Sequence, residues 1–137
     1  MSLADGEADV VMSNAFLEHI PDVERGIREI ARITKVGGLS VHNIDLTDHR
    51  RYGGGAGPLD FLMESSSEPI VHHSNRVRLS QFTELFQRNG FQIVQQIVHH
   101  RLEVPQSLRA RFAKPFRSLS QEDLEAGMVR FTARRLP

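Results

Sequence analysis

The sequence predicts an α/β fold built on a mixed sheet of about four strands with flanking helices. The first observation is the short apolar run Ala8–Met12, whose two valines are typical of a buried strand. The second is a set of apolar residues at helical spacing between Val23 and Ala31. The third is another strand-like segment, Leu39–Asp45. Two strands joined by a helix of about a dozen residues favour a parallel pair with a right-handed crossover.

Length and composition limit the classes of function. The chain has 137 residues, which suits one domain (1–137) with its own core. Its 17 basic and 17 acidic residues balance, so no overall field draws it to nucleic acid or to a membrane. The absence of cysteine excludes disulfides, a thiolate nucleophile and cysteine metal sites. We expect a cytoplasmic protein without a nucleic-acid or membrane partner. Residues 1–3 resemble an expression scar, with the natural protein beginning further upstream.

The residues after the first strand are the first place to look for chemistry, because ligands of open α/β sheets bind beyond the carboxyl ends of the strands. Ser13 and Asn14 end this strand with side chains that hydrogen-bond local backbone. Phe16, Leu17 and Ile20 then repeat at helical spacing. The pattern therefore predicts a strand, a polar elbow and a short helix.

The next helix has clear start and stop signals. Asp22 is a good N-cap, and the helix should end at Lys35–Gly38, where a lysine meets the negative helix end and glycine supplies a left-handed cap. After the second strand, residues 46–77 form a long polar connection, which in a compact domain is typical of a functional lid or a disordered segment. The buried face of the helix is expected to carry Val23, Ile27, Ile30 and Ala31.

A further helix and strand follow the long connection. Ser80 is expected to cap a helix that ends at Asn89–Gly90. Phe91–Val98 then reads as a third strand, in which Gln95–Gln96 indicates either a bulge or an edge position. The buried stripe of the helix is expected to contain Phe82, Leu85 and Phe86.

The last part of the chain is basic before it becomes strand-like. Residues 101–117 could track phosphate, but with zero net charge a solvated helix face with buried Phe112 and Phe116 is the better interpretation. Ser120 and Asp123 resemble a capping box for a short helix ended by Gly127. Residues 129–134 alternate apolar and polar side chains, which predicts a half-exposed fourth strand.

Several of these segments, taken in order, resemble class I S-adenosylmethionine (SAM)-dependent methyltransferases of the small-molecule type. The stretch Glu7–Asp22, with Leu-Glu-His at its centre, is followed by Glu29–Ile33 and by Lys35–Gly38. Residues 75–80 and 85–91 resemble the segment that leads into the family's last two strands. The resemblance runs from Asp5 to the C-terminus. It implies a partial Rossmann-like methyltransferase sheet with two or three parallel strands and an antiparallel last strand, and the spatial order Ala8, Leu39, Met128, Phe91.

The resemblance implies methyl transfer from SAM to an unidentified small-molecule acceptor. Two family features have no counterpart here. They are the Gly-rich turn after the family's own first strand and the acidic residue that ends the family's own second strand. The glycines of Gly53–Gly57 follow charged loop residues rather than an apolar strand, so they do not replace that turn. We therefore expect the C-terminal half of a methyltransferase domain, inactive alone, with weak or no SAM binding.

The resemblance also suggests site residues. Ser13, Asn14 and Ala15 match positions beside the methionine portion of the cofactor, although the first two could simply cap the strand end. His19 could act as a catalytic base, a common role of histidine, or it could bond backbone at the helix end. On a helix it would lie about 100° from Glu18, so the two should not both face the cleft.

Two further polar groups carry alternative interpretations. Asp45, preceded by His42 and Asn43, and His49 just beyond it could contact substrate, or they could form an ordinary polar strand end with its turn. Some relatives hold a metal with an additional Glu, but Ala15 occupies that position, so we expect no metal. The adjacent pairs His72–His73 and His99–His100 would point to opposite strand faces, which does not favour metal binding.

A function of another class is also possible for this sequence: a non-catalytic dimerisation or binding module. Without a neighbour on its outer side, Ala8–Met12 is an apolar edge strand, and such edges pair with other chains. We expect a homodimer in which two copies of this strand meet edge to edge across a two-fold axis.

Overall fold

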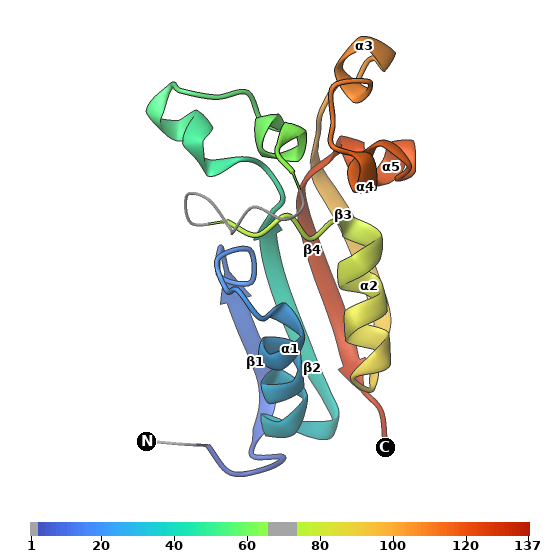
Figure 1. The fold of residues 1–137 in the computed structure, drawn as a ribbon. Helices are drawn as coiled ribbons and strands as arrows, with labels where there is room; N and C mark the ends of the chain where they lie inside the picture. The colour runs from blue at the N-terminus through green and yellow to red at the C-terminus, as the bar shows by residue number, and fades with distance from the viewer. Residues whose placement is uncertain (1–2, 66–73) are drawn as a thin grey trace.

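The computed structural model describes residues 3–65 and 74–137. His72 and His73 lie outside these ranges. Within these ranges, four strands make one sheet, which is accompanied by two longer helices, two 3-10 helices and three short helices (Figure 1). The strands are β1 (Ala8–Asn14), β2 (Thr34–Asp45), β3 (Phe91–Arg101) and β4 (Ala126–Arg135). The helices are α1 (Val23–Ile33), η1 (His49–Gly53), η2 (Asp60–Met63), α2 (Leu79–Arg88), α3 (Gln106–Arg109), α4 (Lys114–Arg117) and α5 (Gln121–Glu125).

The order of strands in the sheet is β1-β2-β4-β3, which confirms the predicted order. β1 and β2 pair in parallel, whereas β4 pairs antiparallel with both β2 and β3. The strands β1, β2 and β3 therefore run in one direction, and only the last strand is reversed. Consequently the carboxyl ends of β1 and β2 lie side by side at one end of the sheet (Figure 1).

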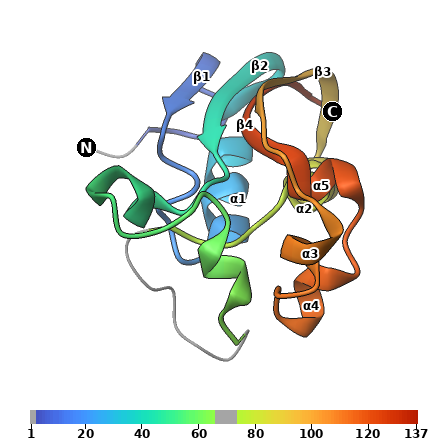
Figure 2. The same cartoon turned by 90° about the horizontal axis from the view of Figure 1, so that it is seen from above.

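Figure 2 shows α1 and α2 on the same side of the sheet. Their apolar faces pack with the buried residues of β2, β3 and β4 into the main core, where the aromatic rings are Phe82, Phe86, Phe91 and Phe131. Val11 of β1 also packs against this core. Because side chains alternate along a strand, Val10 and Met12 point to the other face, where they are 52% and 73% exposed.

The N-terminal end of α1 confirms the prediction, whereas its C-terminal end differs. Asp22 Oδ1 accepts a hydrogen bond from the backbone N–H of Arg25 at 2.9 Å. The helix ends at Ile33 rather than at Lys35–Gly38, because Thr34 is already extended and pairs with β1. Gly37 has the positive φ of +82°, but it lies in the irregular part of β2 and does not cap the helix.

The predicted helix over Phe16–Ile20 is wrong, because these residues form a single turn instead. Asn75, from a distant segment, satisfies the backbone of this turn: its side-chain amide donates to the carbonyls of Leu17 at 2.8 Å and Ile20 at 3.0 Å. Its own backbone N–H donates to the carbonyl of Glu18 at 2.6 Å. Since these carbonyls are paired without a helix, the segment can stay irregular.

The predicted Ser80 cap of α2 is also wrong. The helix begins at Leu79, and Ser80 donates its backbone N–H and its hydroxyl to the Asp123 carboxylate at 2.7 and 2.9 Å. A residue 43 positions away therefore satisfies the start of α2. The predicted end is confirmed, since α2 stops at Arg88 and Gly90 has φ +83°.

Between β3 and β4, two predictions are confirmed and one is incorrect. The register of β3 against β4 shifts between Ile93 and Gln95, as expected for a bulge at Gln95–Gln96 on an edge strand. Ser120 Oγ accepts from the Asp123 N–H at 3.1 Å, which confirms the cap of α5. However, Gly127 lies inside β4 and does not end the helix, which stops at Glu125.

A second apolar cluster joins the 46–65 connection to the segment between β3 and β4. It contains Leu59, Phe61 and Leu62 of the connection together with Leu124 of α5. The rings of Phe112 and Phe116 are buried in it, as predicted for the basic segment. No helix among residues 3–65 and 74–137 combines the length and apolar character needed to cross a membrane.

Candidate functional site

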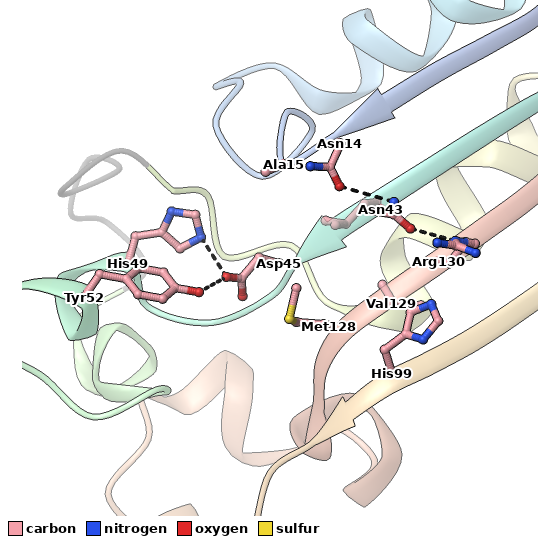
Figure 3. Close-up of a pocket in the computed structure, with 11 residues that line it drawn as sticks. Asn14, Ala15, Asn43, Asp45, His49, Tyr52, His99, Met128, Val129 and Arg130 are labelled. Atoms are coloured by element: carbon pink, nitrogen blue, oxygen red, sulfur yellow. Dashed lines mark hydrogen bonds and ion pairs between the residues drawn. The ribbon is translucent and has the colours of Figure 1, made fainter.

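A pocket of about 460 Å³ opens at the carboxyl ends of β1 and β2 (Figure 3). Its walls come from the elbow after β1, the end of β2, the η1 segment and the adjoining parts of β3 and β4. This position agrees with the rule that ligands of open α/β sheets bind beyond the carboxyl ends of the strands. The lining residues are Asn14, Ala15, Asn43, Ile44, Asp45, His49, Tyr52, His99, Met128, Val129 and Arg130.

The elbow after β1 has a constrained backbone. Ala15 adopts φ +49°, and it is the only non-glycine residue with positive φ within the described ranges. Its N–H donates to the carbonyl of Asn43 at 3.0 Å, so pairing with β2 continues through the turn. Ala15 and Asn14 line the pocket. Ser13, the third residue predicted to bind cofactor, does not line it, because its Oγ lies 2.7 Å from Nδ1 of His42.

His42 is fully buried beneath the sheet end. Its Nε2 lies 2.5 Å from Ser40 Oγ, and its ring stacks on Phe86 with centroids 5.4 Å apart. Burial lowers the pKa of His42 to about 4, so the ring is neutral at physiological pH. Both ring nitrogens are therefore held by serine hydroxyls, and the arrangement supports the strand end rather than the pocket.

The Asp45 carboxylate is the polar centre of the opposite wall. Its Oδ1 accepts from the N–H and the hydroxyl of Thr47 at 2.9 and 2.6 Å. Its Oδ2 accepts from the Tyr52 hydroxyl at 2.5 Å and lies 3.4 Å from Nε2 of His49. Burial alone would raise the pKa of Asp45, but the hydrogen bonds from Thr47 and Tyr52 outweigh it and lower the pKa. The carboxylate is therefore held in its charged form.

A second group of polar side chains lies behind His49. The rings of His19 and His49 meet edge to face with centroids 4.8 Å apart. Glu18 is 1% exposed, and its Oε1 accepts from the Asp45 N–H at 3.2 Å. Burial raises the pKa of Glu18, and its Oε2 has no hydrogen-bond partner among the described residues.

One donor atom from each of Glu18, His19 and His49 lies within 4.8 Å of the others, so these three residues could hold a metal ion. Glu18 and His19 are neighbours in sequence, and their side chains converge because their segment is a turn. On the predicted helix the two side chains would diverge. The expectation that the chain binds no metal stays a prediction.

The structure thus brings four of the six predicted site residues to one pocket: Asn14, Ala15, Asp45 and His49. His19 does not line the pocket, but its ring packs against that of His49. Sequence reasoning missed Tyr52 and Arg130, whereas it named Asn43 as part of the polar strand end before Asp45. His99 was considered only as a metal ligand with His100, yet it lines the pocket by itself. The available signal for Asn43 was its place two residues before Asp45 on the same strand.

The comparisons with known proteins support a methyltransferase-like fold. The profile of a family described as "Methyltransferase domain" matches residues 1–42, which include β1, the elbow and α1. No curated protein is similar in sequence.

Three solved structures illustrate the structural similarity. A chain from the complex of the Haloferax volcanii Trm112 methyltransferase activator with a methyltransferase is 16% identical, with a TM-score of 0.61, over 100% of this chain and 57% of that one. A SAM-dependent methyltransferase from Mesorhizobium loti is 20% identical, with a TM-score of 0.57, over 98% of this chain and 65% of that one. The [4+2]-cyclase SpnF is 16% identical, with a TM-score of 0.58, over 99% of this chain and 53% of that one.

The chain therefore has a class I SAM-dependent methyltransferase-like fold, and it spans about half to two thirds of the length of these similar structures. The presence of a cyclase among them shows that the fold does not by itself determine the reaction.

Proposed function

We propose that this chain forms one side of a SAM-dependent methyltransferase site for a small-molecule acceptor. The observation that carries the proposal is one pocket that joins the Asn14–Ala15 elbow to the Asp45–His49 pair. These two features correspond to a cofactor wall and to a group that can take up a proton. A cytoplasmic location belongs to the same proposal.

The residues of the pocket fit parts of SAM and of a small-molecule acceptor. A volume of about 460 Å³ lies in the common range of small-molecule pockets, about 300–1,000 Å³. Its floor is apolar at Ile44 and Val129, whereas Asn14 and Arg130 offer polar groups at its rim. When bound, SAM supplies an electrophilic methyl group on a sulfonium centre. Asn14 and Ala15 would position the methionyl portion, and Ser13, one residue earlier, stays a predicted cofactor contact.

The Asp45–His49 pair gives the proposed site its proton chemistry. A hydroxyl or amine of the acceptor would form the new bond to the methyl carbon as the sulfur–methyl bond breaks. His49 would accept the proton released from that acceptor atom. Asp45 lies 3.4 Å from His49 Nε2, so its negative charge orients the imidazole and stabilises the imidazolium that forms. His19 packs against His49, and a catalytic role for His19 itself stays a prediction.

We expect this chain to bind SAM weakly. The pocket is walled by β2, β4 and the η1 segment, but within the described residues no strand lies on the outer side of β1. Each missing contact reduces affinity, and a loss of about 1.4 kcal/mol is tenfold in Kd. Millimolar affinity is therefore the expected result for the chain alone.

Calorimetric titration with S-adenosylhomocysteine, the product form of SAM, tests the proposal. We expect weak, saturable binding that Asn14→Ala weakens further. Gln92→Ala is the matched control, because this exposed polar residue of β3 lies outside the pocket. An affinity equal in wild type and Asn14→Ala would contradict the cofactor wall.

A second candidate function is supported by the edge of the sheet. We propose that two copies of the chain pair through β1, because Val10 and Met12 are large, apolar and exposed. In an antiparallel pair centred on Val11, Val10 would lie opposite Met12, and Asp9 would lie opposite Ser13. No like charges would then meet across the junction.

A further inference from the structure

We propose that the side-chain row Asn14–Asn43–Arg130 is a carboxylate-binding subsite, so that the ligand of the pocket carries a carboxylate group. The inference rests on the proposed function and narrows its ligand class. Two sources of this carboxylate fit the site: the methionyl end of SAM, or an acidic acceptor molecule.

The three residues lie side by side across three neighbouring strands. Asn14 of β1 is the register partner of Asn43 of β2, which is in turn the partner of Arg130 of β4. Asn43 Nδ2 donates to Asn14 Oδ1 at 3.2 Å, and Arg130 Nε donates to Asn43 Oδ1 at 2.8 Å. Figure 3 shows this chain of hydrogen bonds along the rim of the pocket. Asn43 thus fixes one edge of the guanidinium group.

The charge of Arg130 has no partner in the part of the chain that the structure describes. Among residues 3–65 and 74–137, no carboxylate forms an ion pair with it, and its Nη atoms make no hydrogen bond. Arg50 is a clear contrast, because its guanidinium binds Asp48 and Glu64, both at 2.5 Å. Arg130 is instead held by a neutral amide and retains its full charge at the pocket.

A carboxylate matches this arrangement better than a phosphate does. The free Nη atoms of a guanidinium form a planar pair of donors that suits the two oxygens of a carboxylate. Arg130 is the single arginine or lysine that lines the described pocket, and Asp45 contributes the opposite charge at its other end. One fixed cation balances a monoanion, whereas a phosphate would bring additional negative charge towards Asp45.

The orientation of the ligand follows from the two ends of the pocket. Arg130 and Asn14 line the rim formed by β4 and β1, while Asp45 and His49 line the opposite wall. An acidic acceptor would place its carboxylate at Arg130 and its nucleophilic hydroxyl or amine near His49. A cofactor carboxylate would instead bind Arg130 beside the Asn14–Ala15 elbow.

The test uses two pairs of probes that differ by the presence of a carboxylate. S-adenosylhomocysteine is compared with 5′-methylthioadenosine, which keeps the nucleoside thioether and has no carboxylate. Separately, 4-hydroxybenzoate is compared with its methyl ester. Binding of each probe to the ¹⁵N-labelled full chain is followed by amide chemical shifts in wild type, Arg130→Gln and Arg134→Gln. Arg134 is the matched control, because it lies on the same strand four residues further on and outside the pocket.

We expect Arg130→Gln to weaken binding of the acidic probe of one pair about tenfold or more, and to leave the affinity for the neutral probe of that pair unchanged. An effect on S-adenosylhomocysteine assigns the subsite to the cofactor, and an effect on 4-hydroxybenzoate assigns it to the acceptor. If Arg130→Gln changes the affinity for neither acidic probe, the proposed carboxylate subsite is refuted. Binding of 5′-methylthioadenosine beside Ala15 would then still support the proposed function. If no probe binds wild type, both proposals fail together. A dispersed spectrum of the variant shows that it is folded.

Discussion

Oδ2 of Asp45 lies 3.4 Å from Nε2 of His49 and simultaneously accepts a 2.5 Å hydrogen bond from the Tyr52 hydroxyl. One buried carboxylate thus connects the end of β2 to two side chains of the η1 segment. The same carboxylate binds Thr47 through its other oxygen. Asp45 therefore ties together the pocket wall through Thr47 and Tyr52, and it lies within ion-pair distance of the imidazole.

Asp45→Asn should lower the free energy of unfolding by about 1–3 kcal/mol at neutral pH, because the amide cannot accept all the hydrogen bonds of the carboxylate. The folded-state pKa of Asp45 lies below its ordinary value of 3.8, so its stabilisation is complete above that value. It is lost as pH falls through the folded-state pKa. Urea denaturation at neutral and acidic pH should show the difference between wild type and variant shrinking with acid. A constant difference would contradict the charged role of Asp45.

Glu18→Gln should have the opposite effect at neutral pH. The pKa of Glu18 is raised by burial above its ordinary 4.5, so its contribution to stability is complete below that value and is lost as pH rises through the raised pKa. Removal of the charge should therefore increase the urea midpoint at neutral pH. Glu122→Gln, on an exposed side chain of α5, should leave the midpoint unchanged. A lower midpoint for Glu18→Gln would show that the buried charge is compensated.

His42 should remain neutral well below the pH at which an exposed histidine titrates. Burial lowers its folded-state pKa from 6.5 to about 4, so stability is complete above 6.5 and falls as pH decreases towards 4. At about 1.36 kcal/mol per unit, the loss over this window is about 3 kcal/mol. An NMR titration of the imidazole C–H signals should show one histidine that does not titrate near pH 6. Titration of every histidine near pH 6 would contradict the burial.

Ala15→Gly should be neutral or stabilise the protein by up to about 1 kcal/mol, because glycine adopts the left-handed φ of +49° without strain. Ala15→Val should destabilise it by about 1–2 kcal/mol, since a β-branched residue disfavours this conformation. Thermal unfolding of both variants gives the comparison. Ala56→Gly is the control, because Ala56 does not have a positive φ, and this substitution should not increase the thermal stability. Equal effects of glycine and valine at position 15 would show that the elbow is not constrained.

The isolated chain should be a dimer by light scattering. Replacing Val10 and Met12 together by lysine should yield a monomer, because lysines would then face each other across the β1–β1 junction. Val94→Lys is the matched control, since Val94 is similarly exposed at 53% but lies on the opposite edge strand, β3. A monomeric mass for the wild-type chain would refute this interface.

The sequence was sufficient where local pattern decides structure. The Asp22 cap and the buried rings of Phe112 and Phe116 follow from capping chemistry and spacing. The strand order, by contrast, was predicted from the family resemblance alone. Two of the errors occur where a distant residue replaces a local partner. Asn75 binds the carbonyls of the 16–20 turn, so no helix is needed there, and Asp123 takes over the cap of α2 from Ser80.

In the candidate site, too, some residues could be predicted from the sequence, whereas others depend on contacts between distant parts of the chain. Asn14, Ala15 and Asp45 could be predicted because they end or directly follow strands whose carboxyl ends meet in a parallel pair. Arg130 could not, because it meets Asn43, 87 positions earlier in the sequence, only through the antiparallel register of β2 and β4. Tyr52 joins the pocket through the fold of the η1 segment, which no periodic pattern reveals.

The most direct measurement is a map of amide chemical shifts of the ¹⁵N-labelled chain during titration with S-adenosylhomocysteine. If the pocket binds the cofactor, the largest shifts should belong to Asn14, Ala15 and Asp45 and should saturate in the millimolar range. Residues around Ser80 and Asp123, which line a separate hollow between α2 and α5, should not shift. Shifts centred on that hollow, or no shifts at Asn14 and Ala15, would contradict a methyltransferase site at this end of the sheet.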